Sequence, residues 1–287
     1  MNIQIISPSG FIEPKYIDGA KQVLASWNCT PSEGKFAREK HGRFAGTEQQ
    51  RIHDLQSALN NPNVEAILCS RGGYGLAQII DKIDFTEFRK NPKWIIGFSD
   101  ITILHNAISA LGIPSLHAIM AKHLTELSEN SPPVAMLKQI LLGEKPTYTV
   151  ASHSLNKQGK AVGKLVGGNL SVLMGSRGTR FDLNYENNIL FLEDIGEKPY
   201  HIDRMMQNLR LSGALAQISG LIVGQFSDID EDPLMHATVY ELIANSVKEY
   251  DIPVCFNFPV GHTDENLPLI VNAEACLDVS SERVLLN

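Results

Sequence analysis

Residues 94–102 read Trp-Ile-Ile-Gly-Phe-Ser-Asp-Ile-Thr, and this stretch decides how we interpret the fold. The apolar residues before Ser99 predict a buried strand, which ends at the polar pair Ser99-Asp100. Apolar residues then recur at helical spacing, at Ile101, Leu104, Ile108 and Leu111. A strand that passes through a short polar turn into a helix is typical of a parallel sheet covered by helices.

The same alternation runs through the rest of the first half. Patterns of apolar residues predict further strands at 2–6 and 66–70, and helices at 15–27, 47–59 and 76–82. The second half mixes short apolar strands with two helical stripes. Its predicted strands are 189–192, 221–223, 253–258 and 267–271, and its stripes run over 202–209 and 239–247. Gly and Pro separate these pieces closely, which favours a compact sheet or a barrel-like domain.

We therefore expect an α/β protein of two domains, which the length of 287 residues also suggests. The N-terminal α/β domain with a parallel sheet should cover residues 1–142, and a smaller C-terminal β-rich, barrel-like α+β domain residues 164–287. Residues 143–163 are rich in Gly, Lys, Ser, Thr and Pro and are expected to be the linker.

Composition excludes several classes of protein. Apolar residues make up 43% and charged residues 20%, as in globular proteins with a sizeable core. The net charge of −7 and the lack of a basic cluster argue against nucleic acid as a partner. No apolar run is long enough to span a bilayer, and the N-terminus lacks the pattern of a secretory signal. Cys69 and Cys255 lie in apolar runs, so we expect buried thiols and a cytoplasmic protein.

Two loops that follow strands in the first half are candidates for chemistry. Ser99 lies where a strand turns into a helix, the position of the nucleophile in serine hydrolases, although only the first glycine of G-x-S-x-G is present. Ser99 or Asp100 could equally cap the helix. Residues 70–75 read Ser-Arg-Gly-Gly-Tyr-Gly, and such a loop can offer free N–H groups to a ligand or simply make a tight turn.

Two polar segments in the second half complete the candidate set. Glu193 and Asp194 end an apolar strand, where a carboxylate needs a partner or caps the next helix. His262 lies on a polar loop between two apolar strands, where a lone histidine is often structural. Together with Ser99 these residues supply a nucleophile, a base and an acid to orient the base. No tight spacing of ligands indicates a metal, so we expect neither metal nor cofactor.

At these residues the sequence resembles the LD-carboxypeptidase family of serine peptidases, which includes microcin-immunity peptidases. The resemblance rests on the segments 70–75, 97–102, 190–194 and 261–264, and on 6–9 and 167–170. It implies a nucleophile Ser99 in an α/β domain, Glu193 and His262 in a smaller β-rich domain, and often a homodimer. The implied reaction is hydrolysis of the L,D bond before the terminal D-alanine of murein tetrapeptides in cell-wall recycling.

This hypothesis assigns further roles. The N–H groups of Gly73 and Asp100 would bind the oxyanion, and Arg71, Tyr74 or Arg204 would bind the substrate, with a guanidinium suited to its free carboxylate. The partner would be a small peptide, with no nucleic acid or membrane involved. Two alternatives stay open: an immunity-type peptidase that cleaves peptidyl-nucleotide antibiotics, and a ligand-binding module without activity.

Overall fold

Two sheets organise the chain in the computed structural model, which describes all residues from 1 to 287. The first compact unit comprises residues 1–144 and 267–270, and the second comprises residues 145–266 and 271–287. No helix is long and apolar enough to cross a bilayer. The two units are described separately below.

The first unit is built on a six-stranded sheet in the order β11-β5-β4-β3-β1-β2. The strands are β1 (Asn2–Ile6), β2 (Thr30–Glu33), β3 (Ala66–Cys69), β4 (Trp94–Gly97), β5 (Ser115–His117) and β11 (Leu269–Val271). The pairs from β2 through β1, β3 and β4 to β5 are parallel. Parallel strands bring their carboxyl ends to one edge of the sheet, so the loops after β1, β3 and β4 are neighbours.

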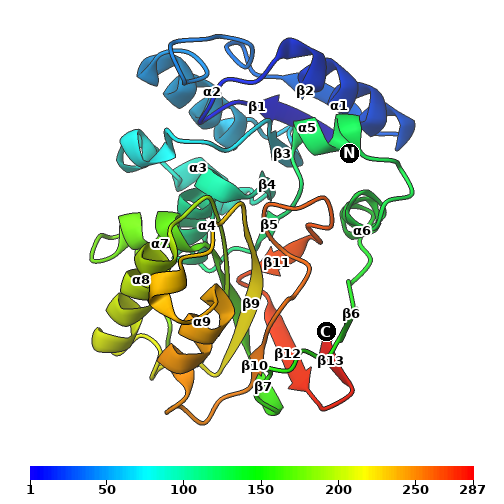
Figure 1. Ribbon diagram of the computed structural model, residues 1–287. Coiled ribbons are helices and arrows are strands. Elements are labelled where there is room, and N and C mark those ends of the chain that lie inside the picture. The colour runs from blue at the N-terminus through cyan, green and yellow to red at the C-terminus, as the bar shows by residue number, and fades with distance from the viewer. The chain divides into compact units, whose positions relative to one another are not determined.

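Helices cover the first sheet on both faces. They are α1 (Pro14–Ser26), α2 (Glu48–Asn60), α3 (Thr86–Lys90), α4 (Thr102–Ser109), α5 (Ala121–Glu126) and α6 (Pro132–Leu141). Apolar residues of α1, α5 and α6 share one core with β1, β3, β4 and β5. Figure 1 shows α1 and α5 side by side, in agreement with the contacts between them. The helix α2 begins at Thr47, which forms a capping box with Gln50.

The second unit is built on a seven-stranded mixed sheet in the order β10-β9-β8-β7-β12-β13-β6. The strands are β6 (Tyr148–Ala151), β7 (Gly159–Asn169), β8 (Ile189–Ile195), β9 (Gly220–Ser227), β10 (Val254–Cys255), β12 (Glu274–Val279) and β13 (Arg283–Leu286). Strands β7 to β10 run parallel, whereas β12, β13 and β6 continue the sheet antiparallel from β7.

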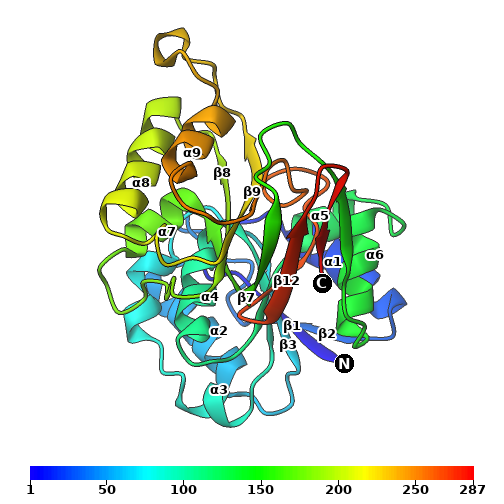
Figure 2. The same cartoon turned by 90° about the horizontal axis from the view of Figure 1, so that it is seen from below.

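Three helices cover the parallel half of this second sheet. They are α7 (Leu170–Ser176), α8 (Pro199–Leu211) and α9 (Val239–Val247). Their apolar residues form a single core with β7, β8, β9 and β10. In Figure 2 the three helices lie on the same side of β8 and β9. Strands β7, β8 and β9 are each followed by a helix that leads to the next parallel strand, and a crossover of this kind is what a parallel sheet requires.

The predicted fold class is confirmed, and the structure adds several differences of detail. The second sheet ends at β10 and β6 and is not a closed barrel, although Lys157, just before β7, exchanges two backbone hydrogen bonds of 3.0 Å with Val254 of β10. Residues 143–163 contain β6 and the start of β7, which pair with β13 and β12 from the far end of the chain. The strand predicted at 267–271 forms as β11 but joins the first sheet. The helix predicted at 76–82 is two 3₁₀ turns that meet at Ile79.

Gly167 shows how closely the strands of the second sheet approach a neighbouring backbone. Its φ is +137°, and a Cβ atom at this position would lie 1.9 Å from the carbonyl oxygen of Phe191 in β8. We therefore expect Gly167→Ala to lower the free energy of unfolding by about 2–5 kcal/mol, through backbone strain and overpacking. Urea denaturation followed by circular dichroism measures this change.

The matched control is Gly175→Ala in α7. A Cβ atom there meets nothing within 4 Å. Alanine is the better helix former by roughly 0.5–1 kcal/mol, so this variant should be at least as stable as the unchanged protein. Equal stability of the two variants would contradict the close approach at Gly167.

Candidate active site

Ser99 occupies a strained turn at the end of β4. Its φ is +65°, in the left-handed region that side chains other than glycine rarely adopt. A 3₁₀ turn, Ser99–Ile101, follows and leads into α4. Such strain persists only where the surroundings enforce it, and it gathers at functional sites. The strand-turn-helix predicted from the sequence is thus present, and neither Ser99 nor Asp100 caps the helix that follows it with its side chain.

The buried side chain of His105 holds the end of β4. Its Nε2 lies 2.8 Å from the carbonyl oxygen of Gly97, and its Nδ1 lies 2.8 Å from Oγ of Ser115. Burial lowers the pKa of His105 to about 4, so the ring is neutral. The carbonyl of Gly97 can only accept, so Nε2 carries the proton and Nδ1 accepts from the hydroxyl of Ser115. The residue before the turn is therefore fixed from inside α4.

The glycine loop, residues 70–75, packs directly against Ser99. A Cβ atom at Gly72 would lie 2.7 Å from Cβ and 2.9 Å from Oγ of Ser99, so any side chain there would have to displace that of Ser99. The carbonyl of Gly72 accepts a hydrogen bond from the N–H of Gly10 at 3.0 Å. The N–H groups of Gly73 and Asp100 are not among the backbone hydrogen bonds that turns and loops form. That these two N–H groups bind an oxyanion stays a prediction.

The carboxylate of Asp100 joins the glycine loop to the Ser99 turn. Its Oδ2 accepts from Oγ of Ser9 at 2.6 Å and from the N–H of Leu76 at 2.9 Å. Burial raises the pKa of Asp100, and these hydrogen bonds together with the charge of Arg51 oppose that rise. The side chain thus has a positioning role that the sequence did not reveal.

Arg51 of α2 supports the same loops and is also buried. Its Nη1 donates to the carbonyl of Gly75 at 2.8 Å and to that of Pro8 at 3.3 Å, and its Nη2 donates to Oε1 of Gln78 at 2.9 Å. The guanidinium also lies 4.8 Å from the ring centroid of Phe44. A planar fork of donors suits this task, because it holds two separate carbonyls at once.

In the second unit, Glu193 and His262 form a hydrogen-bonded pair. Oε2 of Glu193 lies 2.7 Å from Nδ1 of His262. The carboxylate, at the end of β8, is completely buried, whereas the imidazole keeps 15% of its side-chain surface exposed. When the buried carboxylate accepts a hydrogen bond from Nδ1–H, Nε2 of the neutral ring carries no proton. This is how the base is oriented in serine hydrolases.

The charge around His262 favours its protonated form. Burial alone would lower the pKa of His262, but the hydrogen bond and the charge of Glu193 raise it above its ordinary value. The charges of Asp194 and Asp228 act in the same direction. An imidazolium beside Glu193 is therefore stabilised, as a base that has just taken a proton requires.

A glycine and two hydrogen bonds hold the loop that carries His262. Gly261 has a φ of +135°, and a Cβ atom there would lie 3.0 Å from Cβ of Glu193. The N–H of Gly261 donates to Oδ1 of Asn266 at 2.9 Å, and Oγ of Ser227 donates to the carbonyl of His262 at 3.1 Å. The loop can approach the carboxylate because residue 261 has no side chain.

Asp194 faces the other way from Glu193 and anchors the start of α7. It accepts from Nδ2 of Asn169 and from the N–H of Ser171, both at 2.9 Å. Burial raises the pKa of Asp194 to about 6 in spite of these bonds. The two acidic residues at the end of β8 thus have different partners. Glu193 contacts His262, and Asp194 fixes the Gly-Gly-Asn segment at the end of β7.

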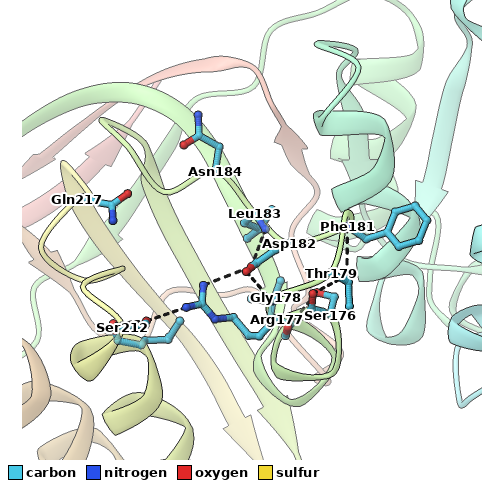
Figure 3. A network of polar contacts seen from close by, with 12 residues as sticks. Ser176, Arg177, Gly178, Thr179, Phe181, Asp182, Leu183, Asn184, Ser212 and Gln217 are labelled. Carbon is cyan, nitrogen blue, oxygen red and sulfur yellow. Dashed lines mark hydrogen bonds and ion pairs between the residues drawn. The ribbon is translucent and has the colours of Figure 1, made fainter.

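The loop after α7 is held by its own polar network, shown in Figure 3. Nη1 of Arg177 lies 3.3 Å from Oδ1 of Asp182, and its Nη2 donates to Oγ of Ser212 at 2.7 Å. Asp182 also accepts from the N–H of Gly178 at 2.9 Å. Arg177 is therefore engaged in structure and is not a candidate for substrate binding.

The three residues predicted to bind substrate lie in different surroundings. Arg71 and Tyr74 are exposed on the glycine loop and line a cavity of about 480 Å³ in the first unit. Arg204 is exposed on α8 in the second unit, with its guanidinium 5.7 Å from the ring centroid of Tyr200. No group of three or more His, Cys, Asp or Glu side chains is placed to hold a metal ion.

Comparison with known proteins agrees with this geometry. The sequence matches the LD-carboxypeptidase N-terminal domain over residues 3–118 and the C-terminal domain over residues 162–277. The chain belongs to the LD-carboxypeptidase family. It is therefore a serine-type carboxypeptidase, a hydrolase.

Relatives and solved structures cover the whole chain. A probable murein peptide carboxypeptidase of Bacillus subtilis is 32% identical, over 99% of this chain and 91% of that protein. A murein tetrapeptide carboxypeptidase of Pseudomonas aeruginosa is 28% identical, over 92% and 89%. The crystal structure of muramoyltetrapeptide carboxypeptidase from Oxalobacter formigenes superimposes with a TM-score of 0.92 at 27% identity, over 100% and 98% of the chains. MccF in complex with glutamyl sulfamoyl guanosine, at 21% identity, shares the fold with a TM-score of 0.88, over 100% of this chain and 95% of that chain.

The Glu193–His262 pair leads to a prediction about the pKa of His262 that can be tested without substrate. In Glu193→Gln the pKa of His262 should fall, because burial still disfavours the charged ring while the negative charge is gone. Titration of the imidazole signals by NMR measures this shift. With the pair intact, the raised pKa stabilises the fold below about pH 6.5, and that contribution is lost as the pH rises through the pKa of the folded state.

Glu197→Gln is the matched control, because Glu197 forms a similar pair with His201 at 3.1 Å. That change should leave the titration of His262 in place. If His262 titrates alike in both variants, Glu193 does not set its pKa.

Proposed function

We propose that Ser99, His262 and Glu193 act as a catalytic triad that hydrolyses the L,D peptide bond before the terminal D-alanine of a murein tetrapeptide. The observation that carries the proposal is the 2.7 Å bond between His262 and the buried carboxylate of Glu193. The strained turn at Ser99 supports it independently.

In the proposed reaction, Nε2 of His262 takes the proton from Oγ of Ser99, which attacks the scissile carbonyl carbon. Glu193 accepts from Nδ1 and stabilises the imidazolium. The N–H groups of Gly73 and Asp100 bind the oxyanion of the tetrahedral intermediate, each worth roughly 3–4 kcal/mol by analogy with other hydrolases. His262 then protonates the leaving amino group, and water releases the acyl-enzyme by the reverse sequence.

The names of the relatives support the substrate. The proteins of B. subtilis and P. aeruginosa are named for murein peptides, and they align over almost their whole length. From these names we propose that a murein peptide is the substrate here and that the protein acts in cell-wall recycling. Arg71 and Tyr74 would then contact the peptide. Arg204 stays a candidate for the same task, with its guanidinium 5.7 Å from the ring centroid of Tyr200.

We also propose that the protein is a cytoplasmic homodimer. All four cysteines are free thiols, and Cys69 and Cys255 are buried, as suits a reducing compartment.

The dimer is proposed because large apolar side chains remain exposed in the second unit, among them Leu211 at 75% and Leu234 at 86%. Sedimentation equilibrium measures the oligomeric state directly, and a monomer at all concentrations would refute the dimer.

Ser99→Ala should abolish release of D-alanine from a murein tetrapeptide, with a loss in kcat of roughly 10⁶-fold as for other triad nucleophiles. Ser99→Gly should be equally inactive and about 1 kcal/mol more stable, because glycine adopts the positive φ without strain. Mass spectrometry of the products and urea denaturation measure the two effects. A peptidyl-nucleotide conjugate, tested in parallel, distinguishes the alternative substrate. Hydrolysis retained without the hydroxyl would exclude Ser99 as nucleophile.

Gly72→Ala should disturb Ser99 while the chain still folds. Gly72 does not have a positive φ, so alanine causes no backbone strain, but its methyl group would lie where the Ser99 side chain is. A displacement of about 1 Å can cost roughly 100-fold in rate, so kcat should fall by that order. Gly175→Ala, whose new methyl group meets nothing, is the control. Unchanged kcat in Gly72→Ala would show that the glycine loop does not constrain Ser99.

A further inference from the structure

We infer that Arg43 and Arg71 form a pocket that binds a carboxylate group of the peptide substrate, an inference that rests on the proposed function. The cavity of about 480 Å³ is lined by both arginines together with Phe11, Gly73 and Tyr74. All of these residues belong to the first unit. No acidic residue lines the cavity. Two guanidinium groups without an acid between them make a site for an anion.

The pocket lies beside the candidate nucleophile along a continuous series of contacts. Gly73 lines the cavity and follows Gly72, where a Cβ atom would be 2.9 Å from Oγ of Ser99. Gly10 lines it too, and its N–H donates to the carbonyl of Gly72 at 3.0 Å. A carboxylate bound in this pocket would therefore belong to a residue of the peptide substrate that lies at, or a few residues from, the bond that Ser99 attacks.

The arginines of this unit are used in different ways. Arg38 is neutralised by Asp18 at 2.6 Å and Glu33 at 2.8 Å. Arg51 is buried and donates to carbonyls. Arg43 and Arg71 are exposed, and neither forms an ion pair. They thus keep charge that the protein itself does not use.

Arg71 is partly preorganised for such a ligand. Its Nη1 donates to the carbonyl of Phe11 at 2.7 Å, which fixes the guanidinium plane and leaves the other N–H groups for a ligand. The ammonium of Lys40 lies 4.6 Å from the ring centroid of Phe11 and adds a third positive charge nearby. A fork of donors held in one plane matches the two oxygens of a carboxylate.

A peptide substrate can present a carboxylate at its C-terminus or on an acidic residue inside the peptide. The test therefore uses three tetrapeptides: the free acid, its C-terminal amide, and a peptide whose internal acidic group is amidated. In the protein with both arginines, the peptide that lacks the recognised carboxylate should be the poorer substrate. The ratio of kcat/KM between acid and amide is the readout, because a general structural defect would not change it.

Arg43→Ala and Arg71→Ala should each lower kcat/KM for the free acid by about tenfold or more, the usual effect of losing a hydrogen bond to a charged group. The same changes should hardly affect the peptide that lacks the recognised carboxylate. One of the two amidated peptides should have a kcat/KM that the arginine changes hardly affect. That peptide shows whether the pocket holds the terminal or the internal carboxylate. Arg71→Lys keeps the charge and should restore part of the preference.

Arg89→Ala is the control, because it removes an exposed arginine of the same unit from α3, outside the cavity. It should leave all three rates unchanged.

Equal losses of kcat/KM on the acid and the amides in the Arg43 and Arg71 variants would overturn the pocket. Failure of the proposed function would be seen separately, as no turnover by the unmodified protein. Calorimetric titration of the Ser99→Ala protein with acid and amides would then judge the pocket alone, and binding of acid and amides with equal affinity would overturn it.

Discussion

The hydrogen bonds of the Asp100 carboxylate are the constraint on which the Ser99 side of the site depends. This one side chain contacts the loop after β1 through Ser9 and the glycine loop after β3 through Leu76, and it belongs to the turn after β4. The three loops can meet because β1, β3 and β4 are adjacent and parallel. A buried carboxylate is costly unless its oxygens accept hydrogen bonds, so the loops and the charge stabilise each other.

The backbone strain at Ser99 and the fixed positions of the groups around it have the same cause. A left-handed serine costs about 1–2 kcal/mol, and it persists because neighbouring groups leave no room for another conformation. His105 holds Gly97 from one side, and Gly72 packs against the serine side chain from the other. The second unit follows the same principle, since glycine at 261 permits a close approach to Glu193 that hydrogen bonds then fix. In both places the candidate side chain is held by groups that lie outside the proposed triad.

Sequence reasoning succeeded where structure is local. The strand, turn and helix around Ser99 are encoded within a short segment, and the structure contains all three. It failed where partners are distant, as for β6 and β7, whose half-exposed residues pair with β13 and β12 near the end of the chain. It also missed Arg51, because a polar residue on an amphipathic helix is expected to face solvent. Arg51 is in fact more deeply buried than its apolar neighbour Ile52.

The distribution of charge says more about the ligand than the total does. A net charge of −7 argues against a polyanion, whose long backbone would experience the field of the whole surface. A small peptide experiences mainly the groups within a Debye length, about 8 Å at physiological salt. Around Phe11 those groups include Lys40, Arg43 and Arg71, none with an acidic partner. An acidic protein can therefore repel nucleic acid and still attract the carboxylate of a short peptide, provided that its cations are gathered next to the reactive turn and left unpaired.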